Sequence, residues 1–107
     1  MYYVYMLRCE DNSIYTGMAA NLEKRLREHF EQDKKKCAKY TLNHKAKKLE
    51  FAWITETRAL ALTLEYHIKT LTKLQKEELI KIGNLANFLG NKIECDKYDK
   101  FEKIIDT

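Results

Sequence analysis

The sequence predicts an α+β domain, with a small three-stranded antiparallel sheet flanked by helices and an extra helical segment at the C-terminus. Three observations support this fold class. Residues 2–7 are rich in β-branched and aromatic types, contain no breaker, and are followed at 9–13 by residues that favour a turn. Large apolar residues alternate with other types over 49–56. Elsewhere, apolar residues recur every three to four positions, the period of a helix.

The first two strands are expected to pair as a hairpin. The segment 2–7 forms the first strand, and 13–18 returns with strand propensity until Gly17. Because glycine lacks a Cβ, the chain can bend there or let a ligand approach the backbone closely. We therefore expect a sterically open site beside Gly17.

A helix is expected from about residue 22 to about residue 32, with Asn21 as its N-cap. Its apolar stripe consists of Leu22, Leu26 and Phe30. Arg25 and His29 are also four residues apart, so they share a face that is displaced from this stripe. A guanidinium and an imidazole should thus project together over the hairpin.

The third strand places Leu49, Phe51 and Trp53 on one of its faces. Thr57 can then cap a second helix. The apolar stripe of that helix consists of Leu60, Leu64, Ile68 and Leu71. Glu65 lies beside the stripe, on the edge of the helix.

A third helix is predicted to start in the capping box Thr72–Gln75 and to stop at Gly83. Its inward residues are expected to be Leu74, Leu79 and Ile82. Asn84 can cap a short helix that ends before Gly90. The tail after it has the pattern of an amphipathic helix or of a partly frayed end.

The chain of 107 residues is long enough for one core. We expect a domain at 1–82 and a C-terminal helical extension or tail at 83–107 that packs on the same domain. No apolar run reaches membrane length, and the N-terminus lacks the basic and apolar regions of a signal peptide, so a cytoplasmic location is expected.

The cysteines favour reduced thiols. Cys9, Cys37 and Cys95 are odd in number, widely spaced and form no CxxC pair. A metal site drawn from Cys37, His44 and His29 remains an alternative, although nothing in the spacing favours it.

Positive charge is concentrated in one part of the chain. The net charge is +4, whereas residues 22–48 contain ten Lys or Arg and four Asp or Glu. Candidate nucleic-acid contacts in this part are Lys34, Lys35, Lys36, Lys39, Tyr40, Lys45, Lys47 and Lys48, and Gly17 is a further candidate outside it. Cations interleaved with aromatic residues suit phosphates and bases, although a solvated loop with lysines that aid solubility explains the same pattern.

The order of the polar and aromatic residues resembles the GIY-YIG nuclease superfamily, and the resemblance covers about residues 1–80. The residues that carry it are Tyr3-Val4-Tyr5, Tyr15-Thr16-Gly17, Arg25, His29 and Glu65. Tyr5 and Tyr15 are ten positions apart, as are Tyr15 and Arg25. The small size and the Lys39-Tyr40-Thr41 segment are similar to the small stand-alone bacterial members. Tyr3 replaces the first glycine of the family signature, and no glycine lies between His29 and Lys39.

The resemblance implies a metal-dependent endonuclease and assigns roles within it. Tyr5 would be the base or proton relay that activates water, with Tyr15 in support, and His29 would assist. Arg25 would clamp phosphate and, as a nearby cation, favour the phenolate of Tyr5, because an unperturbed phenol with a pKa near ~10 is protonated at neutral pH. Glu65 would hold a single Mg²⁺ or Mn²⁺.

The expected substrate is DNA, single-stranded or branched as in repair and recombination, because so small a domain has no separate module for reading duplex sequence. Two alternatives stay open. One is a non-catalytic nucleic-acid-binding module with the same fold, and the other is a protein-interaction adaptor that uses the tail. From the residues taken singly, Tyr5 and Tyr15 could be buried tyrosines with satisfied hydroxyls. Arg25 and His29 could form a solvated helix face, and Glu65 could be a helix partner of Lys69. His44 and His67 receive no role.

Overall fold

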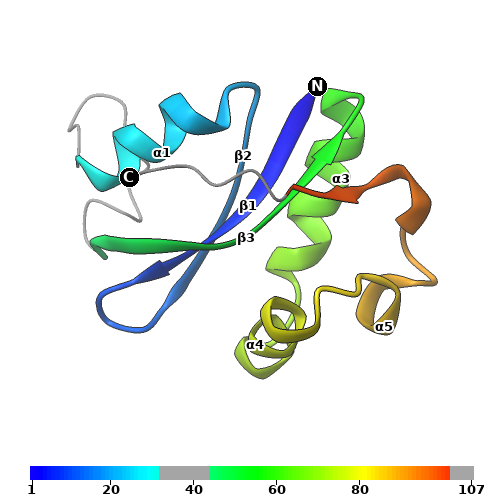
Figure 1. The fold of residues 1–107 in the computed structure, drawn as a ribbon. Helices are drawn as coiled ribbons and strands as arrows, with labels where there is room; N and C mark the ends of the chain where they lie inside the picture. Colours follow the sequence, from blue (N-terminus) through cyan, green and yellow to red (C-terminus); the bar gives the residue numbers. More distant parts are fainter. Residues whose placement is uncertain (32–43, 102–107) are drawn as a thin grey trace.

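The computed structural model describes residues 1–31 and 44–101 (Figure 1). The strands are β1 (Tyr2–Cys9), β2 (Ile14–Ala19), β3 (Ala46–Thr55) and β4 (Asp99–Lys100). The helices are α1 (Leu22–Phe30), α3 (Arg58–Lys69), α4 (Lys73–Ile82), α5 (Ala86–Leu89) and the 3-10 helix η1 (Cys95–Lys97).

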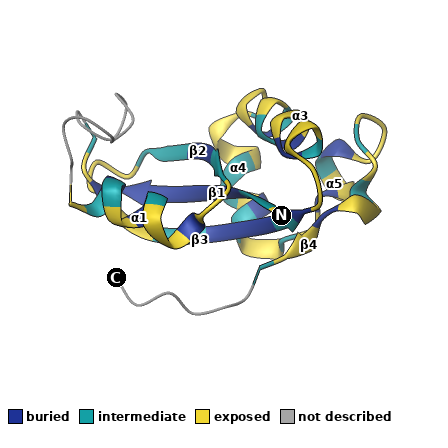
Figure 2. Cartoon of the chain, turned by 90° about the horizontal axis from the view of Figure 1, so that it is seen from above, coloured by how far each residue is buried: buried dark blue, intermediate teal, exposed yellow. Residues whose placement is uncertain are grey.

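The strands form one antiparallel sheet in the order β2-β1-β3-β4. The predicted α+β class, with its three-stranded antiparallel sheet and flanking helices, is confirmed, and β4 adds a short fourth strand. Figure 2 shows α1 and α3 on opposite sides of the sheet. Each face of the sheet therefore has its own buried cluster.

The larger cluster lies between the sheet and the helices α3, α4 and α5. Its fully buried members include Val4, Met6, Leu64, Ile68 and Leu79. The smaller cluster lies under α1 and contains Tyr5, Leu7, Leu22, Leu26, Ala46 and Ala52. The helical stripes predicted for α1 and α3 supply these two clusters.

Local signals correctly predicted the starts of α1, α3 and α4 and the end of α4. The side chains of Asn21, Thr57 and Thr72 accept hydrogen bonds from backbone amides at the starts of α1, α3 and α4. Thr72 and Gln75 form the predicted capping box, and Gly83 ends α4 with a φ of 76°. The left-handed conformation favours glycine at that position.

Strand β3 does not keep the predicted single apolar face. Met6 pairs with Phe51 but Leu7 pairs with Leu49, so Glu50 is an extra residue on β3 and a bulge interrupts the register. Phe51 and Trp53 therefore pack in the larger cluster, whereas Leu49 packs against the smaller one. The expectation for Leu49 was wrong because a one-residue shift moves a side chain to the other face.

Helix α4 buries a different side from the one expected. Leu79 is fully buried as predicted, but Leu74 is 72% exposed and Ile82 is 59% exposed. Glu77 on this helix instead faces the sheet and forms an ion pair with Arg8 of β1. The inward orientation predicted for Leu74 and Ile82 was wrong because a polar contact with the sheet helps set the rotation of the helix.

The described part of the tail is not the amphipathic helix that its pattern suggested. After η1 the chain is extended, and β4 pairs with Trp53 and Ile54 of β3. The hydroxyl of Tyr98 donates to the carbonyl of Leu60 at 2.7 Å, and Thr55 Oγ1 donates to the carbonyl of Lys97 at 2.8 Å. The edge of β3 thus gains partners that a helix could not supply.

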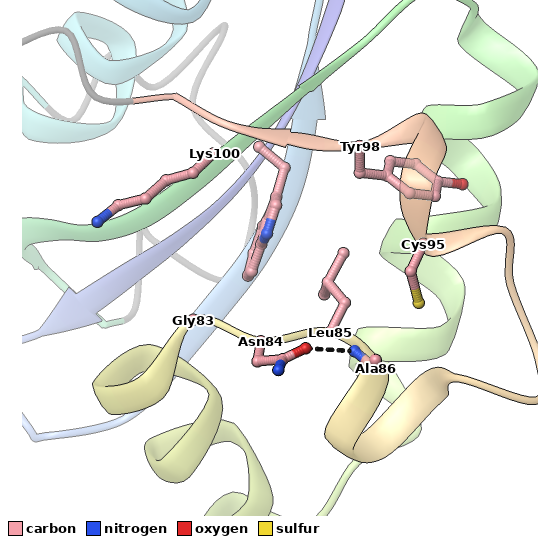
Figure 3. A pocket seen from close by; sticks show the side chains of 8 residues that line it. Gly83, Asn84, Leu85, Ala86, Cys95, Tyr98 and Lys100 are labelled. Atoms are coloured by element: carbon pink, nitrogen blue, oxygen red, sulfur yellow. Dashed lines mark hydrogen bonds between the residues drawn. The ribbon is translucent and has the colours of Figure 1, made fainter.

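A pocket of about 230 Å³ lies where the C-terminal segment meets β3 and the turn between α4 and α5 (Figure 3). Its walls are Trp53, Gly83, Asn84, Leu85, Ala86, Cys95, Tyr98 and Lys100. Asn84 Oδ1 accepts from the amide of Ala86 at 3.0 Å and so shapes the turn beside it. The expectation that Asn84 caps α5 is corrected, because Asn84 lies one residue before the N-cap position, Leu85, which makes no side-chain cap hydrogen bond. None of the predicted catalytic residues lines this pocket.

Cys9 and Cys95 are free thiols, as expected, and Cys37 lies outside the described residues. Among the helices described, none combines the length and apolarity needed to cross a bilayer.

Candidate active site

The candidate site forms on the face of the sheet that α1 covers. Alternation along each strand sends Tyr5 of β1 and Tyr15 of β2 to this face. Tyr5 pairs in register with Gly17, and β2 is an edge strand, so the Tyr5 ring extends over Gly17 toward the rim of the sheet. Arg25 and His29 reach the same place from α1.

Gly17 makes room for Tyr5 and not for a ligand. A Cβ at this position would lie 2.6 Å from the Tyr5 hydroxyl and 2.8 Å from the Tyr15 ring atom Cε2. Such distances are too short for real atoms, so any side chain at position 17 would displace a tyrosine. The expected open approach beside Gly17 is corrected, because the Tyr5 phenol occupies that space.

Tyr5 and His29 form a buried hydrogen-bonded pair. The Tyr5 hydroxyl lies 2.8 Å from His29 Nε2, and both residues are fully buried. Burial, followed by the charge of Arg25, lowers the pKa of His29 to about 4. The imidazole is therefore neutral near neutral pH and can accept a hydrogen bond from the phenol when its own proton is on Nδ1. His29 does not lie on a solvated helix face.

The phenol of Tyr5 is held in its protonated form. Burial is the main cause of its raised pKa, and the neighbouring Tyr15 raises it further. The charge and the hydrogen bond of Arg25 act in the opposite direction but are outweighed. The expectation that Arg25 would favour a Tyr5 phenolate is thus corrected for the protein without substrate, because the cost of burying the anion dominates.

Arg25 has two kinds of partner. Its guanidinium hydrogen-bonds to Tyr5, and its Nη1 donates to Glu28 Oε1 at 3.0 Å. Both members of the ion pair are largely buried, with 24% of the Arg25 side chain and 16% of the Glu28 side chain exposed. Sequence reasoning did not single out Glu28. The spacing could have indicated this pair, because Arg25 and Glu28 are three residues apart and such residues are neighbours on a helix.

Glu65 reaches this group of residues from α3, on the other side of the sheet. Its carboxylate is close enough to Tyr5 to contribute to the raised pKa of the phenol. Its side chain is 19% exposed, and its Oε2 lies 3.8 Å from Lys69 Nζ, the helix pair foreseen as an alternative. Tyr15 completes the group, with its ring centroid 5.2 Å from that of His29. His29 and Arg25 thus hydrogen-bond to the Tyr5 phenol, Tyr15 packs beside it, and Glu65 acts on it through its charge.

The donor chemistry at Glu65 fits a hard divalent cation. Within residues 1–31 and 44–101, no three His, Cys, Asp or Glu side chains come together in a way that could hold a metal ion. A single carboxylate is nonetheless enough for Mg²⁺ or Mn²⁺, since such ions keep several waters and take their remaining ligands from substrate phosphate. Cys37, part of the alternative site with His44 and His29, lies outside the described residues.

The basic residues predicted to contact nucleic acid are only partly described. Lys45, Lys47 and Lys48 are exposed around the start of β3. Lys48 pairs in register with Arg8, three residues along β1 from Tyr5, or ~10 Å away. Lys45 lies 3.9 Å from Glu10 and Lys48 lies 3.3 Å from Glu50, so their charges are partly offset. The other candidates, Lys34, Lys35, Lys36, Lys39 and Tyr40, lie outside the described residues.

This fold and this grouping of residues define a GIY-YIG catalytic domain. Residues 1–78 match the family model of that description, and the chain belongs to the GIY-YIG family. The family implies nuclease activity on nucleic acid, and its members generally use divalent metal ions.

Several small relatives carry the name UPF0213. The chain is 48% identical to UPF0213 protein FN1575 of Fusobacterium nucleatum over 74% of its own length and 76% of the relative's. It is 40% identical to UPF0213 protein YhbQ of Salmonella arizonae, again over 74% of its length and 76% of the relative's. Among solved structures, the solution NMR structure of UPF0213 protein BH0048 of Bacillus halodurans is similar, with a TM-score of 0.51 and 30% identity. That match covers 88% of this chain and 98% of the other.

Proposed function

We propose that this protein is a metal-dependent endonuclease that hydrolyses phosphodiester bonds in single-stranded or branched DNA. The observation that carries the proposal is the convergence of Tyr15, Arg25, His29 and Glu65 on the Tyr5 phenol. Phosphodiester hydrolysis needs an activated water, compensation of charge on the phosphoryl oxygens and help for the departing oxygen. Each need has a candidate group here.

Tyr5 and His29 are proposed to act together as the base. As water attacks phosphorus, its proton passes to the Tyr5 oxygen while the Tyr5 proton moves to His29 Nε2, 2.8 Å away. Tyr5 then needs no free phenolate before substrate binds. In this proposal the neutral imidazole of His29 is the final proton acceptor, whereas the sequence predicted only that His29 would assist.

Substrate binding should make His29 a better base. The positive charge of Arg25 is one of the two causes that lower the pKa of His29. A phosphate bound to the guanidinium would offset that charge, so the pKa of His29 would rise toward its ordinary value. The site would thus be most basic when the phosphodiester is in place.

Arg25 is proposed to clamp the phosphate. Its guanidinium can present two parallel N–H groups to phosphate oxygens, which a lysine could not do. In the protein alone, Glu28 receives one of these N–H groups. A substrate phosphate would compete with Glu28 for it.

Glu65 is proposed to hold the divalent cation, with the remaining ligands supplied by water and phosphate. When bound, such an ion polarises the phosphoryl group and stabilises the departing 3′ oxygen. The exposed cations Lys45, Lys47 and Lys48, together with Lys34, Lys35, Lys36, Lys39 and Tyr40, are proposed to bind the DNA backbone.

The test is cleavage of labelled single-stranded, flap and duplex DNA with Mg²⁺ or Mn²⁺. We expect Tyr5→Phe and Glu65→Gln each to lower the cleavage rate about 100-fold or more. Tyr3→Phe and Glu78→Gln are matched controls on β1 and α4, outside the site, and should cut as the wild type does. The proposal fails if the wild type cuts none of these substrates, or if Glu65→Gln cuts equally well. Binding without cutting would favour the non-catalytic module.

A further inference from the structure

Helix α3 exposes two large apolar side chains next to Glu65. Tyr66 is 65% exposed and Leu62 is 40% exposed. Leu62, Glu65 and Tyr66 are at positions i, i+3 and i+4, so they lie on one side of the helix. We call Leu62 and Tyr66 the outer flank of α3. It adjoins the candidate active site, since Leu62 is a helix neighbour of both Glu65 and Tyr66, three and four residues further along α3.

Cations border the outer flank. Lys69 lies one turn beyond Glu65 on the same side of α3 and pairs with it at 3.8 Å. Burial, and then the charge of Lys69, lowers the pKa of Lys76 on α4, which places the two ammonium groups within each other's field. Glu65 partly offsets the charge of Lys69 in the protein alone, but a cation held by Glu65 would release that charge, and the two ammonium groups would then suit a phosphate.

We propose that an unpaired base of the DNA strand stacks on Tyr66 and contacts Leu62 when the phosphate beside it lies at Glu65. This inference rests on the proposed function and names the feature of the substrate that the site selects. A polyanion complements Lys69 and Lys76, and a base supplies an apolar face for the two exposed side chains. Two side chains form too small a surface for a stable protein interface.

The outer flank should discriminate between unpaired and paired DNA. A base within a duplex is already stacked on both faces, so it cannot lie on Tyr66 unless it leaves the helix. An unpaired base has a free face, so the free-energy cost of moving it onto Tyr66 is smaller. The preference would therefore come from stacking and not from reading base edges, and it would depend little on sequence.

The experiment measures binding to short oligonucleotides that contain 2-aminopurine, whose fluorescence falls on stacking. Binding is followed with Ca²⁺ in place of Mg²⁺ or Mn²⁺, so that a cation can lie between Glu65 and the phosphate while cleavage is suppressed, with single-stranded and duplex forms of the same sequence. We expect Tyr66→Ala to weaken single-strand binding about tenfold and to remove the fluorescence quenching. Duplex binding should change by less than about twofold. Tyr66→Phe keeps the ring and should behave as the wild type does.

Leu74→Ala is the matched control, because Leu74 is 72% exposed on α4. It should leave both kinds of binding unchanged. The inference is overturned if Tyr66→Ala binds single strands as the wild type does, or if it weakens duplex binding equally. Cleavage that depends on Glu65 but not on Tyr66 would overturn this inference alone. If Tyr66→Ala weakens single-strand binding as expected but the wild type cuts no DNA, the proposed function is overturned and this inference is not.

Discussion

Gly17 lies directly across from Tyr5 in the sheet, and the phenol occupies the space that a Cβ would need. We predict that Gly17→Ala displaces Tyr5 from His29, destabilises the fold by about 1–3 kcal/mol and abolishes cleavage. Urea unfolding and cleavage assays measure the two effects. Because the Tyr5 hydroxyl is the nearest atom, at 2.6 Å, Tyr5→Phe should recover part of the lost stability in the double variant. Strictly additive effects on stability would contradict the prediction.

His29 makes stability depend on pH. Its pKa is lowered to about 4 in the folded protein, whereas an unfolded histidine titrates near ~6.5. Between these values the unfolded chain binds more protons, so stability rises with pH and is fully present above about pH 6.5. We expect the free energy of unfolding to fall by about 2 kcal/mol between pH 6.5 and pH 4.

Urea unfolding at several pH values measures this effect. Tyr5, Tyr15, Arg25 and Glu28 surround the imidazole, and His29→Gln leaves all of them in place. The pH slope should be smaller in His29→Gln, whereas the control His67→Gln should keep it. An unchanged slope in His29→Gln would show that other groups cause the pH dependence.

At the scale of elements, Arg8 joins β1, β3 and α4. Its Nε donates to Glu50 on β3 at 3.1 Å, and its Nη1 donates to Glu77 on α4 at 2.6 Å. Nη1 also donates to the carbonyl of Asn12 in the hairpin turn at 3.1 Å, and Lys73 donates to the same carbonyl at 2.9 Å. This network ties α4 to the hairpin.

We predict that Arg8→Ala lowers the free energy of unfolding by about 3 kcal/mol, because it leaves the largely buried Glu50 without its guanidinium partner. Lys69→Ala removes a more exposed ion pair and should cost at most about 1 kcal/mol. Urea unfolding measures both. Similar costs for the two variants would mean that the Arg8 network contributes no more than a surface pair.

At the scale of the whole molecule, the C-terminal segment belongs to the core. Leu85, Leu89 and Tyr98 are buried in the larger cluster, and β4 covers Trp53. We predict that a chain ending at Gly83 has a melting temperature at least about 10 °C lower, because the larger cluster loses these side chains. Thermal unfolding followed by circular dichroism measures the shift.

A control truncation after Phe101 should melt as the full chain does, since it keeps β4. We propose that residues 83–101 are part of one folded unit with 1–82. A chain ending at Gly83 that is as stable as the full chain would instead support an independent domain at 1–82.

The sequence by itself determined the features that depend on neighbours in the chain. The caps at Asn21, Thr57 and Thr72 and the stop at Gly83 are local hydrogen-bonding and backbone effects, so residue type and spacing predict them. The ordered tyrosines, Arg25 and Glu65 likewise indicated the family, because a motif is a pattern in the chain.

Only the tertiary structure decided the features that depend on contacts between distant elements. Each of these features depends on a partner elsewhere in the molecule. The bulge at Glu50 forms against β1, the rotation of α4 goes with the Arg8–Glu77 ion pair, and the strand in the tail pairs with β3. The same holds for the protonation of Tyr5 and His29. Spacing placed His29 near Tyr5, but burial decides that both groups are neutral, because burial depends on the whole packed molecule.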